Sequence, residues 1–214
     1  IRDLVRSRGL GDVYKRQDQL YSDKTILGRW LRSKSTIIKI NDNVFLHGGV
    51  SEEFIIENGV DLEKLNIMMR KHIDFPKKEL KSTEFYDLYY GQKSLVWYRG
   101  YFKKYFEQYQ EDLTEIDISK ILKMLNAKHI VVGHCSHDKV VQLYNNKIFG
   151  VDSSIKKGEY GEVLFIKNKR FYRGNLYGKL IKFNKQDENK NLLLFLLFLL
   201  VSIFFISIIK KKNL

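Results

Sequence analysis

Residues 43–51, NVFLHGGVS, are the stretch from which the fold of this 214-residue chain can be argued. Three apolar residues lead into His47, two glycines follow, and the chain then turns polar. This order is typical of a short buried strand that ends in a histidine, and the glycines allow another group to approach the backbone. A histidine in this position is either packed or part of a site.

A second stretch of the sequence repeats this arrangement. Residues 129–137, HIVVGHCSH, contain a short apolar strand, a glycine and then His134. His47 and His134 can meet if both strands end at one edge of a sheet, where loops build functional sites. Neutral imidazoles suit a transition metal, so the pattern predicts a shared metal site. Two structural histidines remain the alternative.

The remaining sequence predicts a strand-rich α/β domain with irregular insertions. Residues 36–47 predict two strands, Ser51 predicts a helix N-cap, and helices are predicted over 59–73 and 117–127. Hairpins are predicted to turn at Asn145–Asn146 and Asn168–Lys169. The segment 76–112 predicts a cap over a cleft. We interpret its aromatic residues as packing: Tyr86, Tyr89, Tyr90, Trp97, Tyr98 and Tyr101.

The composition allows a packed core and argues against a nucleic-acid partner. Hydrophobic residues make up 44% of the chain, and the single cysteine, Cys135, excludes an internal disulfide. The formal net charge is +13, but residues 1–17 and the three lysines at 210–212 each contribute +3. The mildly basic remainder carries no nucleic-acid-binding motif, so we expect no nucleic acid.

Both ends of the chain differ from the domain predicted over residues 18–180. Residues 1–17 are rich in arginine and are interpreted as a non-native leader, with a basic N-terminal arm as the alternative. A polar linker over 181–191 leads to 192–209, LLLFLLFLLVSIFFISII, which carries no charge. As a helix it would span about 27 Å, so it predicts a single-pass transmembrane helix followed by a basic tail at 210–214. An extracytoplasmic position of the domain is favoured.

Four stretches together resemble a known family. They are LGRWLRSKSTIIKINDNVFLHGGVS, SLVWYRGYF, IVVGHCSHDKVVQLYNNKIFGVDSS and GEVLFIKNKRFYR, within residues 24–175. In this order they resemble calcineurin-like metallophosphoesterases of the PPP type, in the Shewanella-like bacterial subgroup. The resemblance implies the C-terminal part of a double β-sandwich flanked by helices. It also implies two divalent metal ions of the Mn, Fe or Zn class and attack on phosphorus by a metal-bound hydroxide.

The resemblance also implies roles for particular residues. His47 and His134 match metal ligands, and Arg99 in WYRG matches the arginine that binds phosphate. His137 is a further possible ligand and Arg29 a possible supporting residue, whereas His72 and His129 are interpreted as structural. Cys135 beside His134 suggests a Cys/His nucleophile or a zinc site, but the sequence provides no second cysteine and no evident Asn or Asp partner for either.

The family's other ligand motifs, Asp-x-His, Gly-Asp-x-x-Asp-Arg-Gly and Gly-Asn-His-Glu, do not occur in the sequence. We therefore expect an N-terminally truncated, inactive fragment of a membrane-anchored, metal-dependent phosphoesterase. Its expected partners are a phosphorylated substrate and the lipid bilayer. The alternatives are a non-enzymatic, membrane-tethered interaction domain and a basic domain that binds anionic lipid surfaces through lysines at 179–190.

Overall fold

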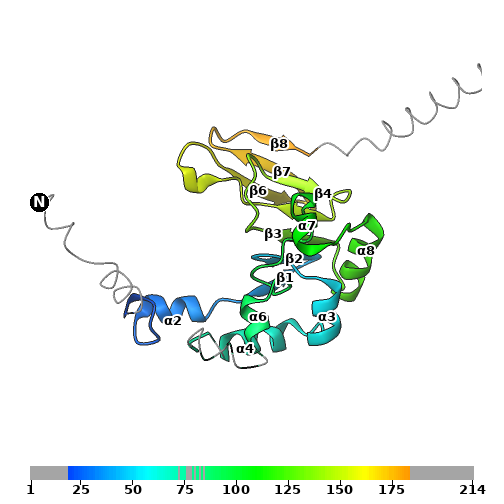
Figure 1. Ribbon diagram of the computed structural model, residues 1–214. Coiled ribbons are helices and arrows are strands. Elements are labelled where there is room, and N and C mark those ends of the chain that lie inside the picture. The colour runs from blue at the N-terminus through cyan, green and yellow to red at the C-terminus, as the bar shows by residue number, and fades with distance from the viewer. Residues whose placement is uncertain are drawn as a thin grey trace, which may run out of the picture. The chain divides into compact units, whose positions relative to one another are not determined.

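The structure of the protein is a computed structural model that describes residues 19–183, apart from 72, 76–78, 80, 82 and 84. The chain divides into two compact units, the first ending at Cys135 and the second beginning at Ser136. Figure 1 shows the helices and strands of both units. The domain predicted over residues 18–180 stays a prediction.

A mixed sheet forms the centre of the first unit. Strand β1 (Ile37–Ile40) pairs antiparallel with β2 (Asn43–Leu46), and β2 pairs parallel with β3 (His129–Val132). The two strands predicted within 36–47 are therefore confirmed, and the turn between them places Asn41 in the left-handed region at φ 54°. Because β2 and β3 run in the same direction, with Leu46 opposite Val132, the two strands end at the same edge.

Helices surround this sheet in the first unit (Figure 1). The Ser51 side chain accepts a hydrogen bond from the Phe54 N–H and caps the following helix, as predicted. Asn66 joins a helix to β1, because its Oδ1 accepts from the Ile37 N–H and its Nδ2 donates to the Ile37 carbonyl. The helical elements are α2 (Ile26–Arg32), α3 (Glu52–Asn58), α4 (Leu62–Lys71), α6 (Tyr86–Tyr90), η1 (Lys103–Tyr105), α7 (Phe106–Tyr109) and α8 (Glu115–Met124).

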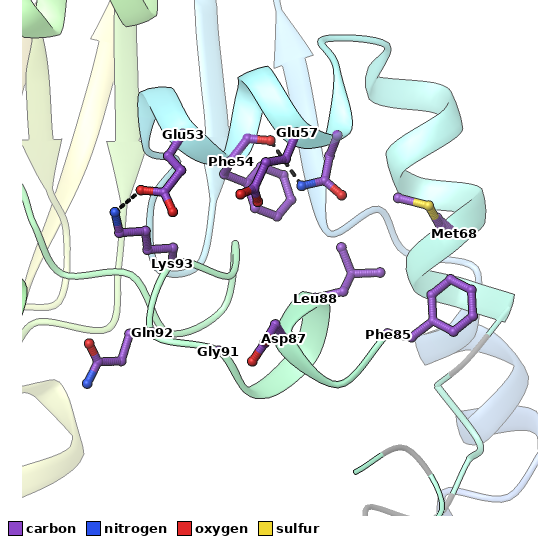
Figure 2. A pocket seen from close by; sticks show the side chains of 11 residues that line it. Glu53, Phe54, Glu57, Met68, Phe85, Asp87, Leu88, Gly91, Gln92 and Lys93 are labelled. Carbon is purple, nitrogen blue, oxygen red and sulfur yellow. Dashed lines mark hydrogen bonds and ion pairs between the residues drawn. The ribbon is translucent and has the colours of Figure 1, made fainter. Parts of the chain in front are cut away.

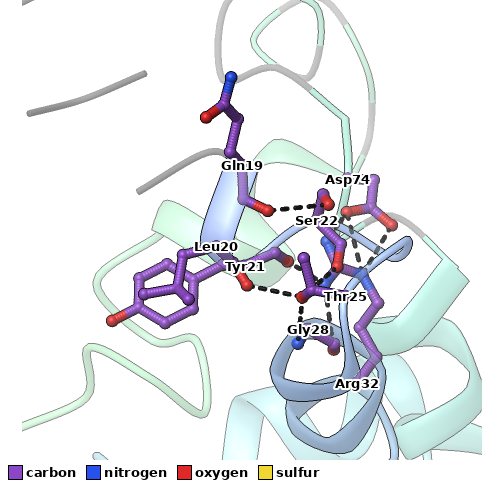
Figure 3. Close-up of polar contacts among 8 residues, drawn as sticks. All are labelled: Gln19, Leu20, Tyr21, Ser22, Thr25, Gly28, Arg32 and Asp74. Carbon is purple, nitrogen blue, oxygen red and sulfur yellow. Dashed lines mark hydrogen bonds and ion pairs between the residues drawn. The ribbon is translucent and has the colours of Figure 1, made fainter. Parts of the chain in front are cut away.

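A cluster of polar contacts stabilises the residues that precede α2 (Figure 3). Thr25 Oγ1 donates to the Leu20 carbonyl over 2.6 Å and accepts from the Gly28 N–H over 2.9 Å. A Cβ at Gly28 would lie 1.8 Å from the Ser22 carbonyl oxygen, so this position requires glycine. This close approach fixes where α2 begins.

The second unit consists mainly of antiparallel strands. A hairpin of β4 (Val141–Leu143) and β5 (Ile148–Gly150) turns through Asn145 and Asn146, both at positive φ. Strands β6 (Glu162–Lys167), β7 (Arg170–Asn175) and β8 (Leu180–Lys182) form a three-stranded sheet, and η2 spans Ile155–Lys157. Both predicted hairpin turns are confirmed, because Asn168 and Lys169 also adopt positive φ.

The predicted fold class needs correction. The described residues are α/β with a mixed sheet: in the first unit β1–β3 pack with helices, and no second sheet accompanies them among its described residues. The double β-sandwich is therefore not supported for this unit.

The predicted membrane anchor is also corrected. None of the helices in the described ranges has the length and apolar character needed to cross a bilayer. The leader at 1–17, the span at 192–209 and the tail at 210–214 lie outside the described residues. We propose no membrane location.

Candidate functional site

The two histidines singled out in the sequence meet at the end of the mixed sheet. His47 follows β2 directly and His134 lies two residues beyond β3, so parallel pairing carries both to one edge. The Gly133 N–H donates to the His47 carbonyl over 2.9 Å and continues this pairing past the strands. As a result His47 Nε2 lies 3.0 Å from His134 Nδ1, and the ring centroids are 4.7 Å apart.

The paired glycines after His47 allow a distant loop to reach the same edge. The N–H of Gly48 donates to the Leu95 carbonyl over 2.9 Å. A Cβ at Gly48 would lie 2.6 Å from the Val96 carbonyl oxygen, and one at Gly49 would lie 2.6 Å from Cδ1 of Tyr98. The glycines are therefore required by the close approach of residues 95–98, which sequence analysis could not identify.

A buried tyrosine holds this loop against the chain after the glycines. Tyr101 Oη donates to the Val50 carbonyl over 2.6 Å and accepts from the Val50 N–H over 3.1 Å. Tyr98 and Tyr101 are almost fully buried and meet edge to face at 5.2 Å. These two residues confirm that tyrosines of the 76–112 segment serve packing.

The same loop places Trp97 beside the histidine pair, and Arg99 follows two residues later. The Trp97 ring meets His134 edge to face, with centroids 5.4 Å apart, and remains 39% exposed. Arg99 Cζ lies 5.8 Å from the Trp97 ring centroid and 5.5 Å from that of Tyr105. The guanidinium thus lies near two aromatic rings, a favourable environment for a cation. Trp97 was interpreted only as packing in the sequence, but its exposed ring borders the site.

Tyr109 forms a hydrogen bond to the backbone of this loop. Its hydroxyl donates to the Trp97 carbonyl over 2.9 Å, which fixes the backbone between Trp97 and Arg99. Burial raises the pKa of Tyr109, although hydrogen bonding to the nearby Arg99 opposes the increase. The hydroxyl therefore stays protonated as a donor at neutral pH.

His134 adopts a backbone conformation that few side chains occupy. Its φ of 63° lies in the left-handed region, where non-glycine residues are uncommon and often belong to functional sites. Cys135 next to it is fully buried, and its N–H donates to the Gly133 carbonyl over 2.7 Å. A buried thiol has no access to a substrate, so the Cys/His nucleophile is not supported.

The structure gives the other candidate residues local contacts. Arg29 donates from Nη1 to the carbonyl oxygens of Lys24 and Asp23, over 2.8 and 3.4 Å, at the turn before α2. His129 begins β3 and its N–H donates to the Asp42 carbonyl. His72 lies outside the described residues. A supporting role of Arg29 stays a prediction.

His137 belongs to the second unit, where a polar network surrounds its backbone. Its N–H donates to the Asp152 carbonyl over 2.8 Å, and the Ser154 hydroxyl donates to the His137 carbonyl over 2.9 Å. Burial acts to raise the pKa of Asp152, but hydrogen bonds from Ser136 and the Ser154 N–H lower it on balance. A ligand role of His137 stays a prediction.

The prediction of a two-metal centre is wrong. Among the described residues, no group of three or more His, Cys, Asp or Glu side chains could hold a metal ion. His47 and His134 meet as a pair, and a firmly bound divalent ion needs more ligands and usually carboxylate charge as well.

Comparisons with known proteins show that the chain is similar to solved structures of phosphatases. No protein-family model matches it, and no curated protein matches it. It is 42% identical to a cold-active protein tyrosine phosphatase solved at 1.1 Å, with a TM-score of 0.70 over 78% of this chain and 47% of that one. The cold-active protein-tyrosine phosphatase of a psychrophilic Shewanella species is 41% identical with the same TM-score, over 78% of this chain and 48% of that one. A mutant cold-active protein tyrosine phosphatase gives the same values.

The chain therefore spans about half the length of the structures it matches. Those structures are named as protein tyrosine phosphatases, so the assignment to calcineurin-like, PPP-type metallophosphoesterases is corrected. The expected reaction through a dimetal-bound hydroxide is corrected with it. These names support the coarser expectations of phosphatase activity and a phosphorylated substrate.

Proposed function

We propose that this chain carries part of the active site of a phosphatase that acts on phosphotyrosine in proteins. One observation carries the proposal. The His47–His134 pair, at 3.0 Å and bordered by Trp97, lies in a chain 42% identical to a protein tyrosine phosphatase. The substrate class comes from the names of the similar structures, and the roles below come from the geometry.

Arg99 is the proposed phosphate-binding residue. Its guanidinium stays charged at any physiological pH and offers a planar fork of N–H donors that matches two phosphate oxygens. Two ring centroids lie 5.5 and 5.8 Å from its Cζ, and its Nη1 donates to the Trp97 carbonyl over 3.3 Å, which limits the rotamers it can adopt. Arg99 is therefore held in place before a phosphate arrives.

Trp97 provides an apolar wall next to the reacting group. Its ring is 39% exposed and touches His134 on one side. The ring of a phosphotyrosine can pack against this surface, and aromatic pairs of this kind contribute about 0.5–1.5 kcal/mol beyond their burial. The wall favours aryl over alkyl phosphates.

The histidine pair is the proposed proton donor. At 3.0 Å a neutral imidazole N–H on one ring donates to the bare nitrogen of the other. An added proton binds the remaining bare nitrogen of the donor ring, and the hydrogen bond between the rings stabilises the resulting positive charge. In hydrolysis a water oxygen bonds to phosphorus and the bond from phosphorus to the tyrosine oxygen breaks. The leaving oxygen takes a proton from the pair, and the water proton returns to it. General acid catalysis of this kind contributes roughly 10²–10⁴-fold.

Turnover of a phosphotyrosine peptide and of p-nitrophenyl phosphate tests the proposal, with binding of inorganic phosphate measured beside it. His47→Ala and His134→Ala should each lower kcat by roughly 10²-fold or more. Arg99→Ala should weaken phosphate binding. The matched controls are His129→Gln, at the far end of β3, and Arg170→Ala in the second unit.

Three results would contradict the proposed roles. Full activity of His47→Ala and His134→Ala would exclude the pair from the reaction, and unchanged phosphate affinity of Arg99→Ala would exclude the arginine. Activity lost on treatment with EDTA and restored by a divalent metal would show that the pair acts through a cation and not as a proton donor.

A further inference from the structure

A cavity separate from the histidine pair opens beside α3 in the first unit (Figure 2). Its volume is about 470 Å³, within the range of sites that hold small ligands or single side chains. Phe54 and Leu88 are almost fully buried at its floor, and Met68 and Phe85 complete an apolar wall.

Carboxylates form the rim of this cavity. Glu53 and Glu57 come from α3, and Asp87 comes from α6 (Figure 2). Lys93 is the one cation among the described lining residues, and ion pairs with Glu53 and, at 3.5 Å, with Glu111 neutralise it. Glu57 and Asp87 form no ion pair with any described residue, so the rim keeps a net negative charge.

This negative rim is unusual for the chain, which has 38 basic and 25 acidic residues. An apolar floor below a carboxylate rim is complementary to a side chain with an aliphatic stem and a cationic head. Arginine and lysine have this form, and a neighbouring apolar residue of a peptide can fill the rest of the floor. Charge complementarity therefore favours a basic polypeptide segment as the occupant.

The two walls of the cavity belong to the same stretches of chain as the histidine site. Helix α3 starts after Ser51, only a few residues beyond His47, and Lys93 leads into the loop that carries Trp97 and Arg99. The bond between the Gly48 N–H and the Leu95 carbonyl joins these walls directly. The six residue-to-residue steps from His47 to Glu53 span at most about 20 Å, a distance that roughly six residues of extended peptide cover.

We propose that this cavity binds an arginine or lysine side chain of a polypeptide that lies across α3. As a substrate-docking site it rests on the proposed function, with the basic residue within about six residues of the phosphotyrosine. The binding of a basic peptide does not depend on catalysis. The cavity thus selects protein substrates by a residue other than the phosphorylated one.

The test uses a fluorescein-labelled peptide of twelve residues that contains an Arg–Leu pair and no phosphate. Fluorescence anisotropy measures its affinity for the whole chain and for the double variant Glu57→Gln, Asp87→Asn. We expect about a tenfold loss of affinity in the double variant, because two exposed charge pairs disappear. The loss should shrink in 1 M salt, which screens charges beyond about 3 Å. Glu63→Gln, an exposed carboxylate of α4 outside the cavity, is the matched control.

Two results would overturn the proposal. One is equal affinity of the wild-type chain for the peptide and for the same peptide with glutamine in place of arginine, a comparison that needs no protein variant. The other is an equal loss in Glu63→Gln, which would indicate a non-specific charge effect. Peptide binding that depends on Glu57 and Asp87, together with a phosphate affinity that Arg99→Ala leaves unchanged, would instead retain the cavity and reject the proposed phosphate-binding site.

Discussion

Replacing Gly48 by alanine should damage both the stability and the site of this protein. The new Cβ would lie 2.6 Å from the Val96 carbonyl oxygen and 3.0 Å from that of Leu95. Both are backbone atoms, so the clash cannot be relieved by a side-chain rotation. An ordinary contact begins at 3.4 Å, and the loop must therefore move by about 0.8 Å. Overpacking of this kind costs about 1–3 kcal/mol of unfolding free energy.

The displaced loop is the one that carries Trp97 and Arg99, so phosphate binding should also suffer. A misplacement near 1 Å can lower activity by roughly 10²-fold, and we expect a loss of tenfold or more in phosphate affinity and turnover. Urea unfolding, followed by circular dichroism, measures the stability, and calorimetric titration measures phosphate affinity.

Gly133→Ala is the matched control, because its Cβ would meet the nearest atoms of His47 only at 3.6 and 3.9 Å. This variant should keep its stability or gain up to about 1 kcal/mol. Normal stability and binding in Gly48→Ala, or equal damage in Gly133→Ala, would refute the reasoning.

Variants at three further positions test other contacts. Tyr101→Phe removes both hydrogen bonds to Val50 and should lower the unfolding free energy by about 2 kcal/mol, measured in urea, because buried backbone groups lose their partner. Ser51→Ala removes the cap of α3 and should cost about 1 kcal/mol, whereas Ser51→Asp should restore most of it. The hydrogen bond from Arg32 lowers the pKa of Asp74, so this carboxylate contributes stability above its unfolded pKa, and the contribution is lost as pH falls through the folded pKa. Asp74→Asn should flatten that acidic decline in urea titrations, and an unchanged slope would contradict the pairing.

Much of the secondary structure could be predicted because its signals are local. Short apolar runs separated by a polar turn define the strands within 36–47. The Ser51 hydroxyl accepts from the Phe54 N–H only three residues away, so this helix start is also a local signal. Asparagine tolerates positive φ, so the turns at 145–146 and 168 can be recognised from the sequence without any tertiary information.

The family and the cofactors were predicted less well, for a different reason. The motifs around His47, Arg99 and His134 were interpreted as fragments of a two-metal centre, but ligand groups depend on which side chains converge in space. Among the described residues only two imidazoles converge, and the similar structures are named as protein tyrosine phosphatases.

The sequence by itself determined that two strands end in histidines and that glycines follow one of them. Only the tertiary structure decided what lies next to them. Parallel pairing of β2 with β3 brings His47 to His134. Because the glycines have no side chains, the Leu95–Arg99 segment can lie directly against their backbone. The acidic cavity depends on tertiary structure in the same way, because Glu57 and Asp87 are thirty residues apart in the sequence and line one cavity only once α3 and α6 are in place. A contact between distant residues leaves no periodicity in either segment, since each segment must satisfy only its own backbone and its own share of the core.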